Sequence, residues 1–154
     1  MARQKVEGLD TVLRRLKELP EKVRRGAVRR ATGKGAAIIR KRAKDNALRL
    51  DDPETGRRIA DNIAQRFRGR YSRRTGDVMI SVGVLSGRGR IPKGNPDEGR
   101  GGNTPHWHLK ELGTAKSAAD PFLRPAAESS QEEVFSGVAD NLGTQVFKEL
   151  EKIR

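Results

Sequence analysis

Apolar side chains recur every three or four residues close to the N-terminus, which is the spacing of one face of an α-helix. The residues that follow this pattern are Leu9, Val12, Leu13 and Leu16. Pro20 follows them, and proline disfavours helical backbone in the residue before it. The sequence therefore predicts a short amphipathic helix that ends at about Leu19.

A second and longer helix is predicted from Glu21 to about Leu48. Its apolar stripe is thin and built mostly from small residues: Val23, Ala27, Ala31, Ile38 and Ile39. At about 1.5 Å per residue this helix spans about 40 Å. Gly33 and Gly35 each cost about 1 kcal/mol relative to Ala inside a helix. We therefore expect either a bend or a closely packed neighbour at these two glycines.

The middle of the chain changes from helical to alternating spacing. Residues 51–57 predict a loop, after which Ile59, Ile63 and Phe67 fit either a short helix or an irregular start of a strand. In residues 77–85, valine and isoleucine at even-numbered positions alternate with other residues, which predicts a strand with one buried β-branched face.

Residues 86–104 contain six glycines and no periodic apolar face, so they predict a flexible loop or the tip of a hairpin. We expect a second strand from His106 to Leu112 that pairs with the first and completes a sheet region over residues 70–114. Asp120-Pro121 indicates a turn before a C-terminal helix over about residues 124–153. The expected buried face of that helix consists of Phe135, Val138, Leu142, Val146, Leu150 and Ile153. The whole pattern predicts one α+β domain over residues 1–154, with N-terminal helices over residues 6–50, a small antiparallel sheet, and the C-terminal helix packed on that sheet.

The sign and the distribution of charge along the chain indicate which classes of partner it can bind. The chain has 33 Lys and Arg against 20 Asp and Glu, a net charge of +13. The net charge falls from +11 in residues 1–50 to +4 in residues 51–104 and −2 in residues 105–154. One end of the molecule can therefore face a polyanion, while the other packs against protein or against the basic end of a neighbouring copy.

The strongest concentration of charge is in the long helix, where ten basic residues and no acidic residue lie between Glu21 and Asp45. The run contains no aromatic residue, which argues against stacking on single-stranded bases. Contact with the DNA backbone and contact with an acidic protein both remain open. The candidate DNA-facing residues are Arg24, Arg25, Arg29, Arg30, Arg40, Lys41 and Arg42.

The sequence gives little indication of a catalytic or metal-binding site. The chain has no Cys, which removes disulfides, thiolate metal sites and Cys nucleophiles. Lys34 lies between two glycines but lacks the spacing of a phosphate-binding loop. His106 and His108 would share a face of a strand, yet no third metal ligand follows with a recognised spacing. We therefore expect no enzyme activity and no cofactor, metal or catalytic site. No apolar run approaches the roughly 20 residues that cross a bilayer, and no signal peptide is recognisable, so we expect a soluble protein made inside the cell and no membrane partner.

Two segments carry a family resemblance: His106-Trp107-His108-Leu109-Lys110-Glu111-Leu112-Gly113-Thr114 and Ala119-Asp120-Pro121-Phe122-Leu123-Arg124-Pro125-Ala126. They resemble a signature of the neck or tail-completion proteins of long-tailed phages, a group of head–tail joining and minor tail proteins that includes relatives of the lambda tail protein Z. Gly8-Leu9-Asp10, Thr55-Gly56 and Val82-Gly83-Val84 agree with the family in order, so the resemblance covers nearly the whole chain.

The resemblance implies a non-enzymatic virion protein that is made in the cytoplasm of the bacterial host and forms a ring, a hexamer, at the head–tail junction. Its implied neighbours are the head connector and the tail terminator or tail tube, and genomic double-stranded DNA passes through its channel. The alternative is a free basic protein that binds nucleic acid without sequence specificity.

We expect the signature residues to maintain the fold more than to contact partners. Gly113 permits positive φ at the end of the predicted strand, and Phe122 can be buried between helix and sheet. The signature residues are Trp107, Glu111, Gly113, Thr114, Pro121, Phe122, Arg124 and Pro125.

Overall fold

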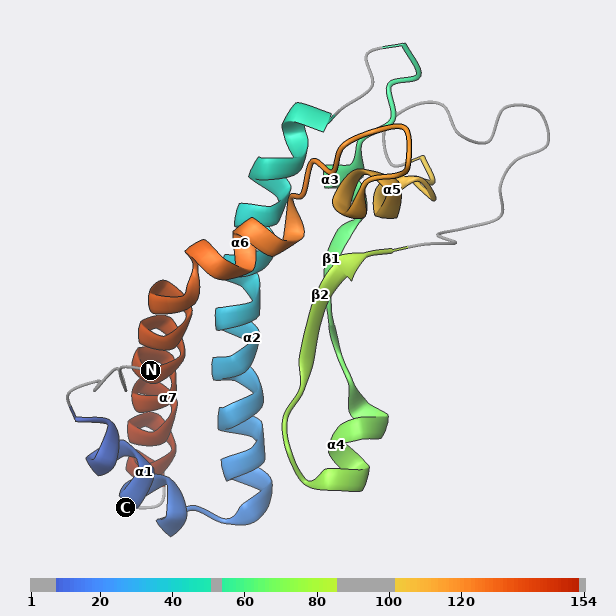
Figure 1. The fold of residues 1–154 in the computed structure, drawn as a ribbon. Coiled ribbons are helices and arrows are strands. Elements are labelled where there is room, and N and C mark those ends of the chain that lie inside the picture. Colours follow the sequence, from blue (N-terminus) through green and yellow to red (C-terminus); the bar gives the residue numbers. More distant parts are fainter. Residues whose placement is uncertain (1–7, 51–53, 86–101, 153–154) are drawn as a thin grey trace. The chain divides into compact units, whose positions relative to one another are not determined.

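The computed structural model describes residues 8–50, 54–85 and 102–152 (Figure 1). The N-terminal half contains α1 (Leu9–Glu18), α2 (Glu21–Ala47), the 3-10 helix η1 (Leu48–Leu50), α3 (Ile59–Asn62), β1 (Ile63–Phe67), α4 (Gly69–Thr75) and β2 (Ile80–Val84). The C-terminal half contains α5 (Trp107–Leu112), α6 (Leu123–Ser129) and α7 (Gln131–Glu151). Strands β1 and β2 form a two-stranded antiparallel sheet. The predicted α+β class is confirmed.

Contacts divide the chain into two compact units, which we describe separately. The helical unit comprises the described residues of 1–37, 67–80 and 132–154, and the motif unit comprises those of 38–66 and 81–131. Helix α2 contributes its first part to the helical unit and its last part to the motif unit.

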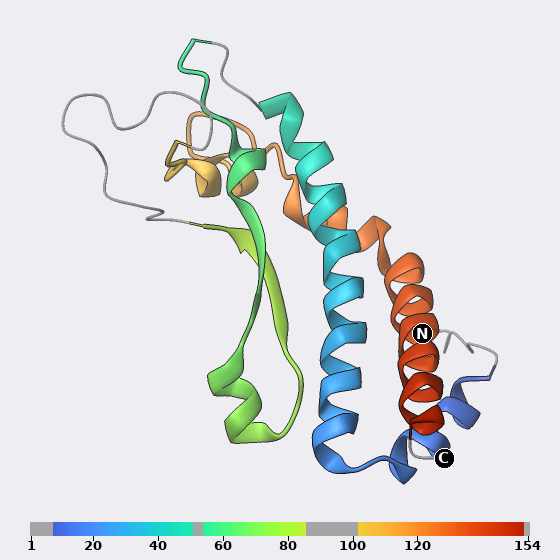
Figure 2. The same ribbon diagram turned by 180° about the vertical axis from the view of Figure 1, so that it is seen from behind.

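The helical unit is formed mainly by α1, the first part of α2, and α7, which lie side by side in both views (Figures 1 and 2). Its buried core consists of Leu16, Leu19, Ala27, Ala31, Leu142 and Val146. The predicted α1 is confirmed, including its end immediately before Leu19 and Pro20. The expected close neighbour is present at Gly35, where it is α7, because a Cβ on Gly35 would lie only 2.6 Å from Val138 Cγ2, whereas a Cβ on Gly33 would lie 3.7 Å from Ile80 Cδ1.

The motif unit has a core of a different composition, with one phenylalanine among alanines and isoleucines. Its buried members are Ala43, Ala47, Ile59, Ala60, Ile63, Phe122 and Ala126. Val82, Val84 and Trp107 pack against this cluster while remaining partly exposed. The expected burial of Phe122 is confirmed, since its exposed fraction is 0%.

The predicted strand from His106 to Leu112 is wrong, because Trp107–Leu112 forms helix α5. The segment lacks β-branched residues, and Leu, Lys and Glu are good helix formers. Short apolar alternation alone does not distinguish a strand from a helix. Among the described residues of the predicted sheet region 70–114, β2 is therefore the only strand.

The predicted C-terminal helix over about 124–153 is interrupted at Ser130, which separates α6 from α7. The Ser130 hydroxyl donates a hydrogen bond to the Ala126 carbonyl at 2.6 Å, so the side chain bonds to the backbone at this break. Helix α7 shares a core with α1, α2 and Leu19. The first part of the predicted C-terminal helix, α6, shares a core with the sheet through Ala126 and Ile63.

Three smaller expectations also change. For residues 59–67 the sequence left open a short helix or the start of a strand, and the structure contains both, the one-turn helix α3 followed by strand β1. Strand β2 is shorter than the predicted 77–85, and all its residues are half-buried, so its β-branched face is not a buried one. Phe135 was expected in the buried face of α7 but is 60% exposed. The expected loop over 86–104 lies outside the described residues except for 102–104, and Ile153 lies outside them too.

Candidate functional site

Helix α2 carries the basic run, and it packs through side chains that are unusually small. Its buried apolar residues are all alanines: Ala27, Ala31, Ala36, Ala43 and Ala47. Because alanine has no long side chain, neighbouring elements approach the helix closely while its Lys and Arg residues extend around the remaining surface. The helix therefore combines tight packing with a high density of positive charge.

Four of the seven candidate DNA-facing residues make contacts within the chain. Arg25 donates to the Ser72 carbonyl at 3.2 Å, and the Arg29 guanidinium lies 4.1 Å from the centre of the Phe67 ring. Arg30 donates to Gln145 Oε1 at 2.7 Å and forms a 3.4 Å ion pair with Glu149. Arg42 donates to the Ser129 carbonyl at 2.7 Å. These four side chains therefore join α2 to other elements of the fold.

The other three candidate DNA-facing residues make no such contact within the described part of the chain. Within the described ranges, the side chains of Arg24, Arg40 and Lys41 make no hydrogen bond or ion pair. Lys41 is exposed, and Lys34 lies seven residues earlier on the same face of α2 and is also exposed. Exposed cations on a rigid helix can attract a polyanion without reading its sequence.

The family signature forms a hydrogen-bonded corner that is centred on Glu111. The Glu111 carboxylate accepts three backbone N–H bonds, from Phe122 at 2.8 Å, Leu123 at 2.9 Å and Arg124 at 2.9 Å. These N–H groups begin α6 and have no carbonyl partner inside that helix. Glu111, which is 8% exposed, therefore caps α6 from a different element. Pro125 fits the same first turn because it has no N–H that requires a partner.

A tight turn returns the chain from α5 toward α6. Gly113 has φ +75°, and a Cβ there would lie 2.7 Å from the Ala119 backbone nitrogen, so only glycine fits. Thr114 Oγ1 accepts N–H bonds from Lys116 at 3.2 Å and from Ser117 at 3.0 Å. The Asp120 N–H then donates to the Lys110 carbonyl at 2.8 Å, which closes the turn.

Sequence reasoning missed two residues that bind this corner, Asn46 in the last turn of α2 and Arg49 in η1. Asn46 Nδ2 donates to the Phe122 carbonyl at 3.2 Å. Arg49 donates to the Pro121 carbonyl at 2.9 Å and forms an ion pair with Asp120. No local pattern identifies either residue, because their partners lie more than 70 residues away in the sequence.

The two histidines do not share a face as expected for a strand. His106 occupies the N-cap position of α5 and His108 lies within that helix, where residues two positions apart diverge. Trp107 lies between them in the sequence, and its ring is nearly perpendicular to that of His108, with ring centroids 6.0 Å apart. Across the described ranges, His, Asp and Glu side chains form no group of three that could hold a metal ion.

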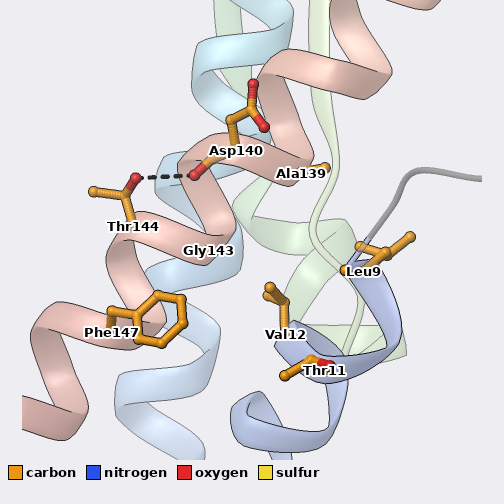
Figure 3. Close-up of a pocket in the computed structure, with 9 residues that line it drawn as sticks. Leu9, Thr11, Val12, Ala139, Asp140, Gly143, Thr144 and Phe147 are labelled. Atoms are coloured by element: carbon orange, nitrogen blue, oxygen red, sulfur yellow. Dashed lines mark hydrogen bonds between the residues drawn. The ribbon is translucent and has the colours of Figure 1, made fainter.

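Apolar side chains also lie at the surface of the described residues. Helix α5 exposes Leu109 by 45% and Leu112 by 66%. In the helical unit, a groove of about 590 Å³ lies between α1 and α7 (Figure 3). Its lining residues are Gly8, Leu9, Thr11, Val12, Ala139, Asp140, Gly143, Thr144 and Phe147. Among the described helices, none is both long and apolar enough to cross a membrane.

Comparison with known proteins identifies the family. Residues 10–113, about two thirds of the chain, match the HK97-gp10-like family model, described as "Bacteriophage HK97-gp10, putative tail-component". The match includes the basic helix α2 and ends at Gly113, so it covers the Glu111 side of the corner and not the Phe122 side. Searches of the curated proteins and of the solved structures found no match. The chain belongs to the HK97-gp10-like family of phage tail components, which makes it a virion protein.

Proposed function

We propose that this protein forms a ring at the head–tail junction of a long-tailed phage, as one domain per subunit, with the DNA channel at its centre. The observation that carries the proposal is the family match, which covers the whole basic helix. A virion position of this kind requires no catalytic residue, metal or cofactor. The neighbouring proteins are the head connector on one side and the tail terminator or tail tube on the other.

The charge of α2 supports a role beside DNA. Arg24, Arg40 and Lys41 make no hydrogen bond or ion pair to other described residues, so their charges can be balanced by phosphate. Such contacts hold DNA without registering its sequence, which suits a channel through which the whole genome passes. Arg25, Arg29, Arg30 and Arg42 also contribute to the positive potential, although their contacts within the chain hold them to the fold.

The ring is tested by native mass spectrometry of purified protein and of isolated phage necks. We expect one closed assembly, six copies, that is present at the neck. A chain that occurs only as two-fold dimers in the particle contradicts the ring. A monomer that binds DNA at physiological salt and is absent from the particle favours the alternative of a free nucleic-acid-binding protein.

The DNA contact is tested by replacing Arg24, Arg40 and Lys41 with Gln in one variant. Each lost phosphate contact lowers the slope of log affinity against log salt by about 0.9, so the triple variant loses up to about 2.7. The matched control replaces Arg14, Lys17 and Lys148, which removes the same charge from α1 and α7. If both variants keep the wild-type slope, the basic run contacts an acidic protein instead.

A further inference from the structure

Helix α4 carries a dense group of arginines that lies outside the basic run of α2. Five arginines and no acidic residue lie between Asp61 and Asp77 in the sequence. Three of them, Arg70, Arg73 and Arg74, belong to α4 and are exposed. Their spacing of three and four residues places them on one face of the helix. We call these three residues the α4 arginine face.

The other side of α4 fixes this helix to α2 within the helical unit (Figures 1 and 2). Ser72 lies nearly opposite the α4 arginine face and is buried. Its carbonyl accepts hydrogen bonds from the Gly76 N–H at 3.0 Å and from the Arg25 side chain of α2 at 3.2 Å. Just before α4, the Phe67 ring lies 4.1 Å from the Arg29 guanidinium of α2. The α4 arginine face is therefore exposed on a helix that is held in place.

The α4 arginine face is not neutralised by any residue that the structure describes. Its three side chains make no hydrogen bond or ion pair to other described residues. Asp77 follows α4 closely but makes no ion pair within the described ranges. Glu21 of α2 pairs with Arg25 at 3.6 Å. The positive charge of this face is therefore available to an anion outside the chain.

Stability of α4 itself does not account for the three arginines. Cations in the last turn of a helix interact favourably with the helix dipole, which fits Arg73 and Arg74. Arg70 lies in the first turn, where the dipole disfavours a cation and where α4 has no acidic residue. Like charges three and four residues apart also repel each other. The α4 arginine face therefore destabilises its own helix unless an anion lies against it.

We propose that the α4 arginine face binds the phosphate backbone of double-stranded DNA. Its guanidinium groups match phosphate oxygens in a fixed fork geometry. The face has no apolar side chain, whereas the buried centre of a protein–protein interface is mainly apolar. Contacts to phosphate need only cations, so DNA fits this face better than an acidic protein does. The inference rests on the proposed function for DNA as the partner, and it assigns a contact to residues outside α2.

Replacement of all three arginines of the face with Gln tests the contact in the full-length protein. A labelled DNA duplex of arbitrary sequence is titrated with protein at several salt concentrations. We expect the slope of log affinity against log salt to fall by up to about 2.7, which is about 0.9 for each lost phosphate contact. The corresponding triple Lys variant keeps the charge and should retain the slope. Circular dichroism and thermal melting of each variant show whether it is folded.

The matched control is the Gln variant of Arg14, Lys17 and Lys148, which removes the same charge from α1 and α7. We expect it to change the slope much less than the α4 variant does. An equal fall in both variants would assign the effect to net charge and would overturn the contact. A slope that stays at the wild-type value in a folded α4 variant would overturn it too.

A single cysteine locates the DNA independently, because the natural chain contains none. Arg73→Cys, coupled to a photoactivatable cross-linker, is expected to attach to the duplex. Lys148→Cys replaces an exposed cation of α7 in the same way and is expected not to attach. Equal attachment from both positions, or none from Arg73→Cys, rejects the contact. In isolated necks, attachment of Arg73→Cys to another virion protein and not to DNA shows that a protein occupies this face.

Failure of this contact can be separated from failure of the proposed function. A lower slope in the Gln variant of Arg24, Arg40 and Lys41, but not in the α4 variant, keeps DNA beside α2 and rejects the α4 contact. Wild-type slopes in both variants reject DNA on either surface. Native mass spectrometry tests the ring separately from both DNA contacts.

Discussion

The interior of the helical unit and the interior of the motif unit are stabilised by different kinds of interaction. The core of the helical unit consists of leucine, valine and alanine on α1, α2 and α7, together with Leu19. The motif unit buries Asn62, Thr104, Glu111 and Ser130 beside its apolar cluster. Asn62 Nδ2 donates to Thr104 Oγ1 at 3.0 Å, and Glu111 accepts three backbone N–H bonds.

This difference shows what each kind of core specifies. Apolar stripes on helices bring the helices together but tolerate exchange among residues of similar volume. Buried polar groups require particular partners at particular positions, and a lost partner is costly. The signature residues lie in the motif unit, where Glu111 makes contacts of this second kind.

Phe122→Ala is expected to cause the largest loss of stability, and this loss should begin in the motif unit. Phe122 is fully buried, and its truncation should lower the free energy of unfolding by about 3–5 kcal/mol. Thermal melting measures the loss, and hydrogen exchange should show it first in α3, α5 and α6. Phe135→Ala removes the same side chain from a 60% exposed position and should have little effect. Equal loss of protection in α1 and α7 would show that the two units unfold as one and would weaken the comparison.

Glu111→Ala should have the next largest effect. It leaves three N–H groups at the start of α6 without their acceptor, which should cost about 3 kcal/mol. Glu111→Gln keeps one acceptor oxygen and should cost less, while the exposed Glu128→Ala serves as control. Urea denaturation gives the order of the three variants. If Glu111→Ala were as stable as Glu128→Ala, the motif unit would not depend on its polar cap.

Gly35→Ala probes the tight helix packing in the helical unit. The new Cβ would lie 2.6 Å from Val138 Cγ2 and 3.1 Å from Val134 Cγ1, and overpacking of this kind costs about 1–3 kcal/mol. Adding Val138→Ala should recover part of the loss in a double-mutant cycle. Gly33→Ala is the matched control, because its nearest contact is Ile80 Cδ1 at 3.7 Å. A loss in Gly33→Ala equal to that in Gly35→Ala would assign the effect to the backbone and not to α7.

The smallest expected effect is that of Arg30→Gln. The Arg30 and Glu149 side chains are 50% and 19% exposed, and ion pairs at such positions contribute about 0.2–1 kcal/mol. Chemical denaturation at low and high salt should show a small difference that shrinks as salt is added. A loss that is large and independent of salt would show that the helical unit also relies on a specific polar contact.

Sequence periodicity predicted α1 and the first part of α2 well because each carries its own apolar stripe, whereas α4, which has none, lies in the region predicted as sheet. Leu16 and Ala27 are buried as the spacing of α1 and α2 requires, and Pro20 separates the two helices. The same reasoning failed for Phe135, whose spacing matches the buried face of α7 although the side chain is 60% exposed. Periodicity indicates which residues share a face but not how far a neighbouring element covers that face.

By itself, the sequence determined the α+β class, the two N-terminal helices, the family signature and the special backbone of Gly113. Tertiary structure decided that residues 107–112 are a helix, that Ser130 divides the C-terminal helix, and which arginines of α2 bind the rest of the fold. The physical reason is the range of the interactions. Stripes, turns and prolines act within a few residues, whereas Glu111, Asn46 and Arg49 acquire their roles from backbone groups that only the folded chain brings to them.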